Sequence, residues 1–365
     1  MSSAEKKLDS LYRKNLIIAK TMRYGESIIR QVYPGWNKDE LADLLVESWS
    51  RPYVFQKYVH FRERPFHGKY INVHEAGFRS SINQGPWPPD RDKYFTIFLF
   101  GGSTTFGYGV PDNQTIASHL QTFFTNIYSE KEIRIYNFGQ GHYYSTQERI
   151  LFQELIAAGY KPDLALFIDG LNEFFYYDED HAPYASDFAK LVKGELWSLW
   201  LKSMRRKSFF MTITQWKKSL RGLFFNRQRR LLKNRYNHHD PSRIQCVINR
   251  FMMNKRMIEA VAVSYSISTQ FIWEPVPTYN YDLSLHPYAA AGFGRHTYSQ
   301  TGYPAMKAYL QQHPEVKDLL WCADIHEGST EPLYVDIVHY SPLMSRMIAE
   351  QIFQFLIKKL SYFNQ

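Results

Sequence analysis

One serine in this chain lies where chemistry could begin. Ser103 follows an apolar run and two glycines in the stretch FTIFLFGGSTTFG, residues 95–107. Three interpretations compete: a loop that cradles phosphate, a nucleophile presented at the end of a strand, or only a tight turn. A phosphate loop needs the pattern G-x-x-x-x-G-K-[ST]. Gly102 and Gly107 have the right separation, but Tyr108 stands in place of the lysine, so the phosphate loop is excluded.

Other chemistries fail on similar grounds. The stretches GYGVPD and GQGHYY both lack the third glycine of a dinucleotide-binding fingerprint. The nucleophile elbow G-x-S-x-G is missing its final glycine. Two His-Glu pairs lack the second histidine of a zinc protease, and the two cysteines have no metal-ligand spacing. These residues are His74-Glu75, His326-Glu327, Cys246 and Cys322. We therefore expect no metal and no cofactor.

A nucleophile is the interpretation that survives. The two glycines before Ser103 permit a sharp turn and a close approach by a substrate carbonyl. A serine hydroxyl needs a base, an orienting carboxylate and donors for the developing oxyanion. Asp336 and His339 can hydrogen-bond to each other and leave one imidazole nitrogen facing Ser103. Asn172 offers an amide donor further along the chain. Each signal alone is common, whereas their joint order is hard to obtain by chance.

Alternating strands and helices must position these residues. We expect strands at residues 94–101, 132–139, 163–170 and 269–276, each a short apolar run closed by Gly or Pro. A helix is expected from Ser145, with Glu148 completing a capping box, to Gly159. The last helix should begin with Ser341 as its cap and Pro342 at the first helical position. This alternation predicts a parallel sheet covered on both faces, with ligands at the carboxyl ends of its strands.

At this point the chain resembles the SGNH (GDSL-type) hydrolase superfamily. Four blocks appear in the family's order: FGGST, NFGQGHYYSTQE, DGLNE and DIVH, over about residues 94–360. The resemblance implies an α/β fold, a flavodoxin-like three-layer α/β/α sandwich with a central parallel sheet. To this the sequence adds a helical N-terminal extension and a helical basic insertion.

The resemblance also implies roles for individual residues. Ser103 would be the nucleophile, His339 the general base and Asp336 the group that orients the base. The oxyanion hole would consist of the Ser103 N–H, an N–H of the glycine block, assigned to Gly141, and the Asn172 side chain. The implied reaction is cleavage of an acyl ester by an esterase or deacylase through an acyl-enzyme. An acyltransferase using the same residues, or a non-catalytic binding protein on this fold, stays open as an alternative.

Three departures from the family pattern bear on these roles. The first block reads Gly-Gly-Ser rather than Gly-Asp-Ser, which is tolerable because that aspartate is not the triad acid. Glu173 stands where the family often has Asp. His142 occupies the position five after Asn137, directly behind Gly141, so which N–H enters the oxyanion hole stays open. His142 is either a substrate contact or a histidine at the surface or the edge of the core.

The substrate is less well defined than the reaction. Two long loops, residues 272–283 and 288–304, are expected to wall the site, and their Tyr, Trp and His content suits a sugar or a small acyl group. The residues predicted to bind substrate are His142, Glu173, Trp273 and Tyr279. The expected partner is thus an acylated small molecule, sugar or lipid.

Charge divides the chain into regions. The net charge is +9, but residues 196–239 contain twelve Lys and Arg and no acidic residue, so the remainder carries about −3. We predict an N-terminal helical extension and connector over residues 1–93. A hydrolase domain follows over 94–365, with the basic aromatic insertion at about 190–240. That insertion suits an anionic membrane or an anionic carrier, or is a solvated helical hairpin. No specific nucleic-acid binding is expected.

The chain is predicted to be cytoplasmic, with any membrane contact peripheral. The first residues lack the apolar core of a signal peptide. No run of about 18 apolar residues offers a membrane span. Two cysteines in apolar settings suit a reducing compartment.

Overall fold

A five-stranded parallel sheet with the order β6-β5-β7-β8-β9 forms the centre of the fold. The computed structural model describes residues 26–125, 127, 131–177 and 240–359. The sheet strands are β5 (Tyr94–Gly101), β6 (Glu132–Asn137), β7 (Leu164–Asp169), β8 (Ser268–Trp273) and β9 (Leu319–Trp321). Because the chain runs from β5 outward to β6 and then back to β7, the order reverses at β5. This is the flavodoxin-like strand order, and it makes the β5/β7 edge the expected ligand site.

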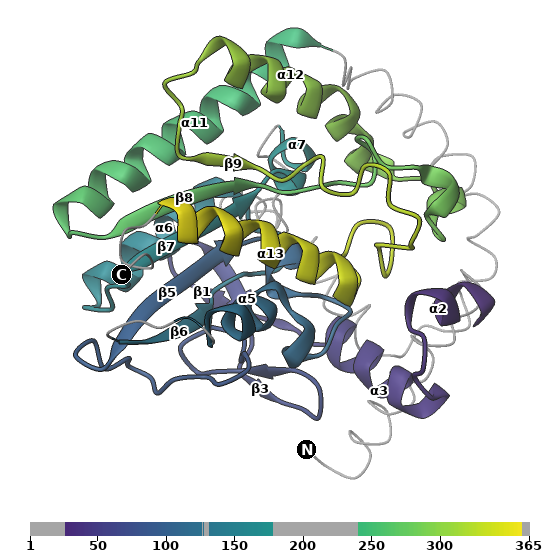
Figure 1. Ribbon diagram of the computed structural model, residues 1–365, viewed down its shortest axis with the longest axis horizontal. Coiled ribbons are helices and arrows are strands. Elements are labelled where there is room, and N and C mark those ends of the chain that lie inside the picture. Colours follow the sequence, from purple (N-terminus) through teal and green to yellow (C-terminus); the bar gives the residue numbers. More distant parts are fainter. Residues whose placement is uncertain (1–25, 126, 128–130, 178–239, 360–365) are drawn as a thin grey trace, which may run out of the picture. The chain divides into compact units, whose positions relative to one another are not determined.

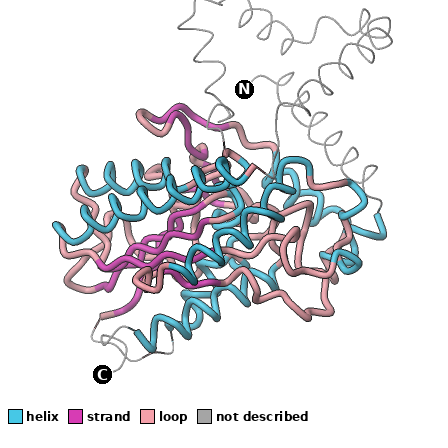
Figure 2. The backbone as a smooth tube through the Cα atoms, turned by 90° about the horizontal axis from the view of Figure 1, so that it is seen from above, coloured by secondary structure: helices cyan, strands magenta, loops and turns pink. Residues whose placement is uncertain are grey.

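Helices cover both faces of the sheet (Figures 1 and 2). On one face α5 (Ile116–Thr125) and α13 (Pro342–Lys359) share an aliphatic core with β5, β6 and β7. On the other face α6 (Ser145–Ala157) and α11 (Pro241–Ser264) contribute aromatic rings. Phe152 packs edge-on to Phe100 and Phe167, and Phe251 packs edge-on to Phe271. The three-layer α/β/α architecture is confirmed.

The expected strands are all present, and each begins within one residue of its expected start. Strand β9 was not predicted, because it has only three residues, all half-buried, and carries no periodic signal. The helix α13 begins as expected, with the Ser341 hydroxyl accepting from the Met344 N–H at 3.3 Å. Helix α6 ends as expected, with Gly159 just beyond its end in the left-handed region at φ 91°.

The predicted cap of α6 is displaced by one residue. Tyr144, not Ser145, is the N-cap, and Gln147 accepts a hydrogen bond from the Tyr144 N–H at 3.4 Å. Glu148 instead lies fully buried beside Asp169. Burial, followed by repulsion from Asp169, raises the pKa of the Glu148 carboxyl well above its usual range. The capping-box spacing was therefore a coincidence.

The N-terminal part is helical only as far as Trp49. The helices among its described residues are α2 (Glu26–Val32) and α3 (Lys38–Trp49). Two antiparallel strand pairs follow: β1 (Tyr53–Gln56) with β2 (His60–Glu63), and β3 (Phe66–His67) with β4 (Asn72–Val73). Shorter elements complete the described fold: α4 (Ser103–Phe106), α7 (Leu171–Phe175), α12 (Ser299–Gln312) and four 3-10 turns at Asp112–Gln114, Leu283–Leu285, Ala289–Ala291 and Gly294–Tyr298.

A fully buried arginine fastens this N-terminal part to the sheet. Arg79 forms a β-bridge with Asn137 at the end of β6. Its guanidinium binds the Asp112 carboxylate at 2.8 Å and donates to the Phe106 and Val110 carbonyls at 2.9 and 2.6 Å. Residues 1–175 and 248–365 accordingly form one compact unit, and residues 176–247 form a second. The boundary predicted after residue 93 stays a prediction, and Arg79 and the sheet lie in the same compact unit.

The basic insertion predicted at about 190–240 lies outside the described residues, apart from its last position. Within the part of the chain that the structure describes, no helix is both long and apolar enough to cross a membrane.

Candidate active site

Three side chains from distant parts of the chain meet at the carboxyl edge of the sheet. Ser103 is the first residue of α4, directly after β5, and its Oγ lies 2.8 Å from Nε2 of His339. The other imidazole nitrogen, Nδ1, lies 2.9 Å from each carboxylate oxygen of Asp336. Asp336 in turn accepts the N–H groups of Val338 and His339 at 3.0 and 2.9 Å, which fixes the carboxylate in the turn. The structure thus brings together the three residues expected to form a triad.

The hydrogen-bond roles in this group follow from the chemistry of its members. A carboxylate can only accept, so Nδ1 of His339 must carry the hydrogen that Asp336 receives. Nε2 is then the acceptor for the Ser103 hydroxyl. His339 and Asp336 keep only 12% and 17% of their side-chain surface exposed. The arrangement is that of a serine whose proton has a receiving base already in place.

Two hydrogen-bond donors lie beside the turn that carries Ser103. The Ser103 N–H opens helix α4 and therefore has no acceptor within that helix. Asn172, in α7, donates one hydrogen of its Nδ2 group to the Tyr143 carbonyl at 2.7 Å, and the group carries a second hydrogen. The structure thus places Asn172 beside the nucleophile turn, as the resemblance implies.

Glycine at position 102 leaves room for this arrangement. A Cβ added to Gly102 would lie 2.5 Å from Nδ2 of Asn172 and 3.1 Å from the Tyr143 carbonyl oxygen. No side chain fits there without moving the amide. The Gly-Gly-Ser departure from Gly-Asp-Ser thus falls at a position where the Asn172 amide and the Tyr143 carbonyl lie close to the backbone.

The Gly141 N–H does not serve as the third donor in this structure. It donates to the Glu63 carboxylate at 3.3 Å, so the assignment of Gly141 to the oxyanion hole has to be corrected. The two preceding N–H groups are also engaged, Gly139 with the Asn137 side chain at 3.0 Å and Gln140 with the Gly101 carbonyl at 2.9 Å. The glycine block is held in place by these bonds rather than offered to a ligand.

His142 is the one predicted substrate residue that lies at the surface near the triad. Its backbone has φ 68°, a left-handed conformation that is uncommon for histidine. The imidazole keeps contact with solvent and lies edge-on to Tyr53, with ring centroids 5.9 Å apart. Partial desolvation lowers its pKa, and His339 nearby lowers it further. His142 is thus held in its neutral form beside the proposed base.

The other three predicted substrate residues are structural in these surroundings. Glu173 is fully buried, pairs with Arg250 at 3.2 Å and accepts the Ser145 N–H at 2.7 Å. Trp273 is fully buried among aromatic rings, and Tyr279 is only 8% exposed and packs on Tyr303. Neither Glu173 nor Trp273 is accessible to a substrate here, and the loop-composition argument therefore failed at Trp273. An aromatic-rich loop segment can equally be a core segment.

The N-terminal part supplies a wall of the site that the sequence did not reveal. Trp49, the last residue of α3, lies edge-on to His339, with ring centroids 5.0 Å apart, and the Tyr108 ring lies 5.6 Å from the same imidazole. The Tyr108 hydroxyl donates to Glu63, and Arg51 pairs with Glu63 at 3.1 Å. No motif or spacing marks these residues, and two of the contacts, Trp49 with His339 and Tyr108 with Glu63, join positions far apart in the chain.

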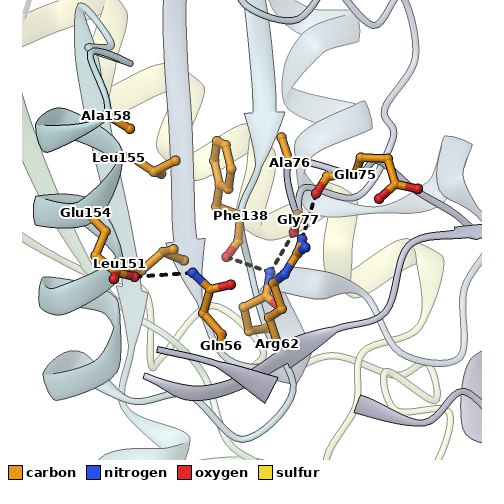
Figure 3. Close-up of a pocket in the computed structure, with 11 residues that line it drawn as sticks. Gln56, Arg62, Glu75, Ala76, Gly77, Phe138, Leu151, Glu154, Leu155 and Ala158 are labelled. Carbon is orange, nitrogen blue, oxygen red and sulfur yellow. Dashed lines mark hydrogen bonds between the residues drawn. The ribbon is translucent and has the colours of Figure 1, made fainter. Parts of the chain in front are cut away.

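A cavity of about 350 Å³ borders the glycine block at Phe138 and Gln140 (Figure 3). It is lined by polar side chains such as Gln56, Arg62 and Glu154 together with apolar residues of α6, and no triad residue contributes to it. Its link to the site is Gln140, whose side chain donates to the Gly77 carbonyl at 2.7 Å and accepts the Glu63 N–H at 2.7 Å. Among the described residues, no cluster of three or more His, Cys, Asp or Glu is arranged to hold a metal ion.

Comparison with known proteins adds structural neighbours. No protein-family model matches the sequence, and no curated protein does either. Solved structures that resemble this one include a putative lipolytic protein of the G-D-S-L family from Desulfitobacterium hafniense DCB-2, with 11% identity over 71% of this chain and 98% of that one, at a TM-score of 0.37. The acetyl xylan esterase AlAXEase has 12% identity over 72% and 100%, at 0.36. The psychrotrophic esterase EstA from Pseudoalteromonas sp. has 11% identity over 73% and 99%, at 0.37.

Proposed function

We propose that this protein is a serine hydrolase that cleaves an acyl ester through an acyl-enzyme on Ser103. The observation that carries the proposal is the continuous hydrogen-bonded line from the Ser103 hydroxyl through His339 to Asp336, with donor–acceptor distances of 2.8 and 2.9 Å. A serine hydroxyl is a poor nucleophile unless a base receives its proton, and this line supplies the base.

The reaction follows in two halves. Ser103 Oγ attacks the ester carbonyl carbon while Nε2 of His339 takes the hydroxyl proton. The resulting oxyanion is stabilised by the Ser103 N–H and the second hydrogen of the Asn172 amide. As the intermediate collapses, the C–O bond to the alcohol breaks, and His339 returns the proton to the departing oxygen. Water then attacks the acyl-enzyme, with His339 as base again, and releases the acid and free Ser103.

The proposed substrate is an acylated sugar, an acylated small molecule or a lipid. Exposed His142 and the aromatic wall formed by Trp49 and Tyr108 support an alcohol portion that has both polar and apolar surface. Neutral imidazoles and aromatic faces are both suited to such ligands.

Turnover of p-nitrophenyl acetate and butyrate, together with covalent labelling by a fluorophosphonate probe, tests this proposal. Replacing Ser103→Ala should lower kcat by at least about 10⁴-fold and abolish labelling, because the attacking oxygen is gone. Ser264→Ala, at an exposed serine on α11, is the matched control and should behave as wild type. If the wild-type protein shows neither turnover nor labelling, the proposal fails and a non-catalytic binding protein remains as the alternative. Acyl transfer to an added alcohol that outruns hydrolysis would favour an acyltransferase.

A further inference from the structure

One buried carboxylate touches all three segments that carry the proposed site. Glu274 follows strand β8 directly and is 2% exposed. Its Oε2 accepts the Thr104 hydroxyl at 2.7 Å and lies 2.9 Å from the Tyr340 hydroxyl, while its Oε1 accepts the Leu171 N–H at 3.2 Å. The Tyr340 hydroxyl shares its single hydrogen between this carboxylate and the Pro275 carbonyl at 2.6 Å.

Each of these partners is the chain neighbour of a site residue. Thr104 follows Ser103 in helix α4, and Tyr340 follows His339. Leu171 opens helix α7, immediately before Asn172. The Glu274 side chain therefore forms hydrogen bonds to the chain neighbours of the proposed nucleophile, base and amide donor. These three segments are otherwise separated by many tens of residues in the sequence.

The carboxylate is itself held from both sides. The Glu274 N–H donates to the Asp169 carbonyl at 2.8 Å, which continues the β7–β8 ladder, and the Glu274 carbonyl accepts the Tyr303 hydroxyl at 2.9 Å. Glu274 is thus held in place by the sheet rather than by a loop. From Glu274, hydrogen bonds through Thr104 and Tyr340 lead to Ser103 and His339, and one through Leu171 leads to Asn172.

A carboxylate in this place is costly to the fold. Burial raises the pKa of Glu274 to about 7, even though its three hydrogen bonds and the nearby His339 act in the opposite direction. An apolar residue of similar size would avoid that desolvation cost. A buried acid bonded to neighbours of every site residue is explained if placing those residues is its role.

Building on the proposed function, we infer that Glu274 is a positioning residue that fixes the nucleophile turn, the base and the oxyanion donor relative to one another. Substrate is not required to touch it. Its contribution is to keep the Ser103 hydroxyl, Nε2 of His339 and the Asn172 amide in register, since misplacement of about 1 Å at a reacting group lowers rates about hundredfold.

Kinetics of Glu274→Leu and Glu274→Gln test this inference. Leu removes all acceptors and should lower kcat about hundredfold with KM within about threefold, because positioning acts on the chemical step. Gln has the same shape as Glu and keeps one acceptor oxygen, so kcat of Glu274→Gln should be at least about tenfold higher than that of Glu274→Leu. Tyr334→Phe, a buried tyrosine whose hydroxyl contacts His326 rather than Glu274, is the control and should keep wild-type kcat. Unchanged kcat in Glu274→Leu, or equal losses in Leu and Gln, would overturn the inference.

A second measurement does not depend on turnover. Hydrogen–deuterium exchange on Glu274→Leu should show the segments around Thr104, Leu171 and Tyr340 exchanging faster together, while strands β5 and β7 stay protected. Acceleration in one segment only would overturn the inference. If Glu274→Leu does not fold, Thr104→Val and Tyr340→Phe remove single contacts, and wild-type kcat in both would overturn it. A wild type without turnover would refute the proposed function, and the exchange result would still decide the role of Glu274.

Discussion

At the scale of single residues, the proposed site depends on the absence of a side chain at position 102 as well as on the proposed triad. The Asn172 amide occupies the volume that a Cβ at position 102 would need. The two positions are therefore coupled, although 70 residues of chain separate them. A substitution at Gly102 acts on the amide before it acts on the serine.

Gly102→Ala should lower kcat about 10²–10³-fold with little change in KM, because the added methyl group displaces the Asn172 donor from the oxyanion. Steady-state kinetics with p-nitrophenyl acetate measure this effect. The double variant Gly102→Ala/Asn172→Ala should be no slower than the slower single variant, since both remove the same donor. Fully additive losses would show that the two residues act independently.

Asp336→Asn should lower kcat about 10⁴-fold while leaving Ser103 in place. Nδ1 of His339 now donates to a carboxylate; an amide that presents its NH₂ group there would hold the imidazole in the other tautomer, with no lone pair on Nε2 for the serine proton. The rate of fluorophosphonate labelling is the direct measurement. A loss of less than tenfold would show that Asp336 does not set the tautomer.

The sequence allowed part of the site to be predicted at this scale. Ser103, Asp336 and His339 could be identified because each belongs to a recognisable block of the sequence. Glu63 could not, because its contact with Gly141 spans 78 positions and no motif surrounds it. The prediction that Trp273 binds substrate failed because the sequence around a buried aromatic residue can look the same as that around a ligand-binding one.

At the scale of elements, the hairpin β1–β2 is part of the site rather than an appendage. Its last residue, Glu63, is fully buried and receives Arg51, the Tyr108 hydroxyl and the Gly141 N–H. This hairpin thereby holds the glycine block on one side of the proposed nucleophile. Neither β1–β2 nor β9 was predicted, since short strands without strict alternation give no periodic signal. The four long sheet strands were predicted from apolar runs closed by Gly or Pro.

Arg51→Leu should destabilise the fold by about 3–5 kcal/mol, because it leaves the Glu63 carboxylate buried without its cation. The Arg51 and Glu63 side chains are 3% and 0% exposed, so solvent cannot replace the lost partner. Urea unfolding followed by tryptophan fluorescence measures the free energy of unfolding. Arg64→Leu, at an exposed arginine next to Glu63, should change it by no more than about 0.5 kcal/mol. Equal effects of the two substitutions would contradict the assignment.

At the scale of the whole molecule, stability should depend on pH through buried histidines. His326 is 1% exposed, with Nε2 donating to the Tyr279 carbonyl at 2.8 Å and Nδ1 accepting the Tyr334 hydroxyl at 2.8 Å. Burial lowers its pKa to about 4. Between its unfolded pKa of about 6.5 and the folded value, only the unfolded chain takes up the proton, so the free energy of unfolding falls as pH falls.

His326→Gln removes this proton linkage. The substitution should destabilise the fold at pH 7.5, and the difference from wild type should shrink by up to about 3 kcal/mol at pH 4.5. Urea unfolding of both proteins at the two pH values gives the comparison. A difference that is constant with pH would mean that His326 takes up its proton equally well in the folded and unfolded chains.

The buried guanidinium of Arg79 has a practical consequence for shortening this protein. The turn after the nucleophile helix draws its donors from Arg79, a residue that precedes the first sheet strand. A minimal version that began at β5 would keep every triad residue. It would, however, leave Asp112 and the carbonyls of Phe106 and Val110 without the guanidinium that now satisfies them. A fragment meant to keep the proposed site therefore has to begin upstream of Arg79, because a fragment that starts at the first sequence block would lack this guanidinium.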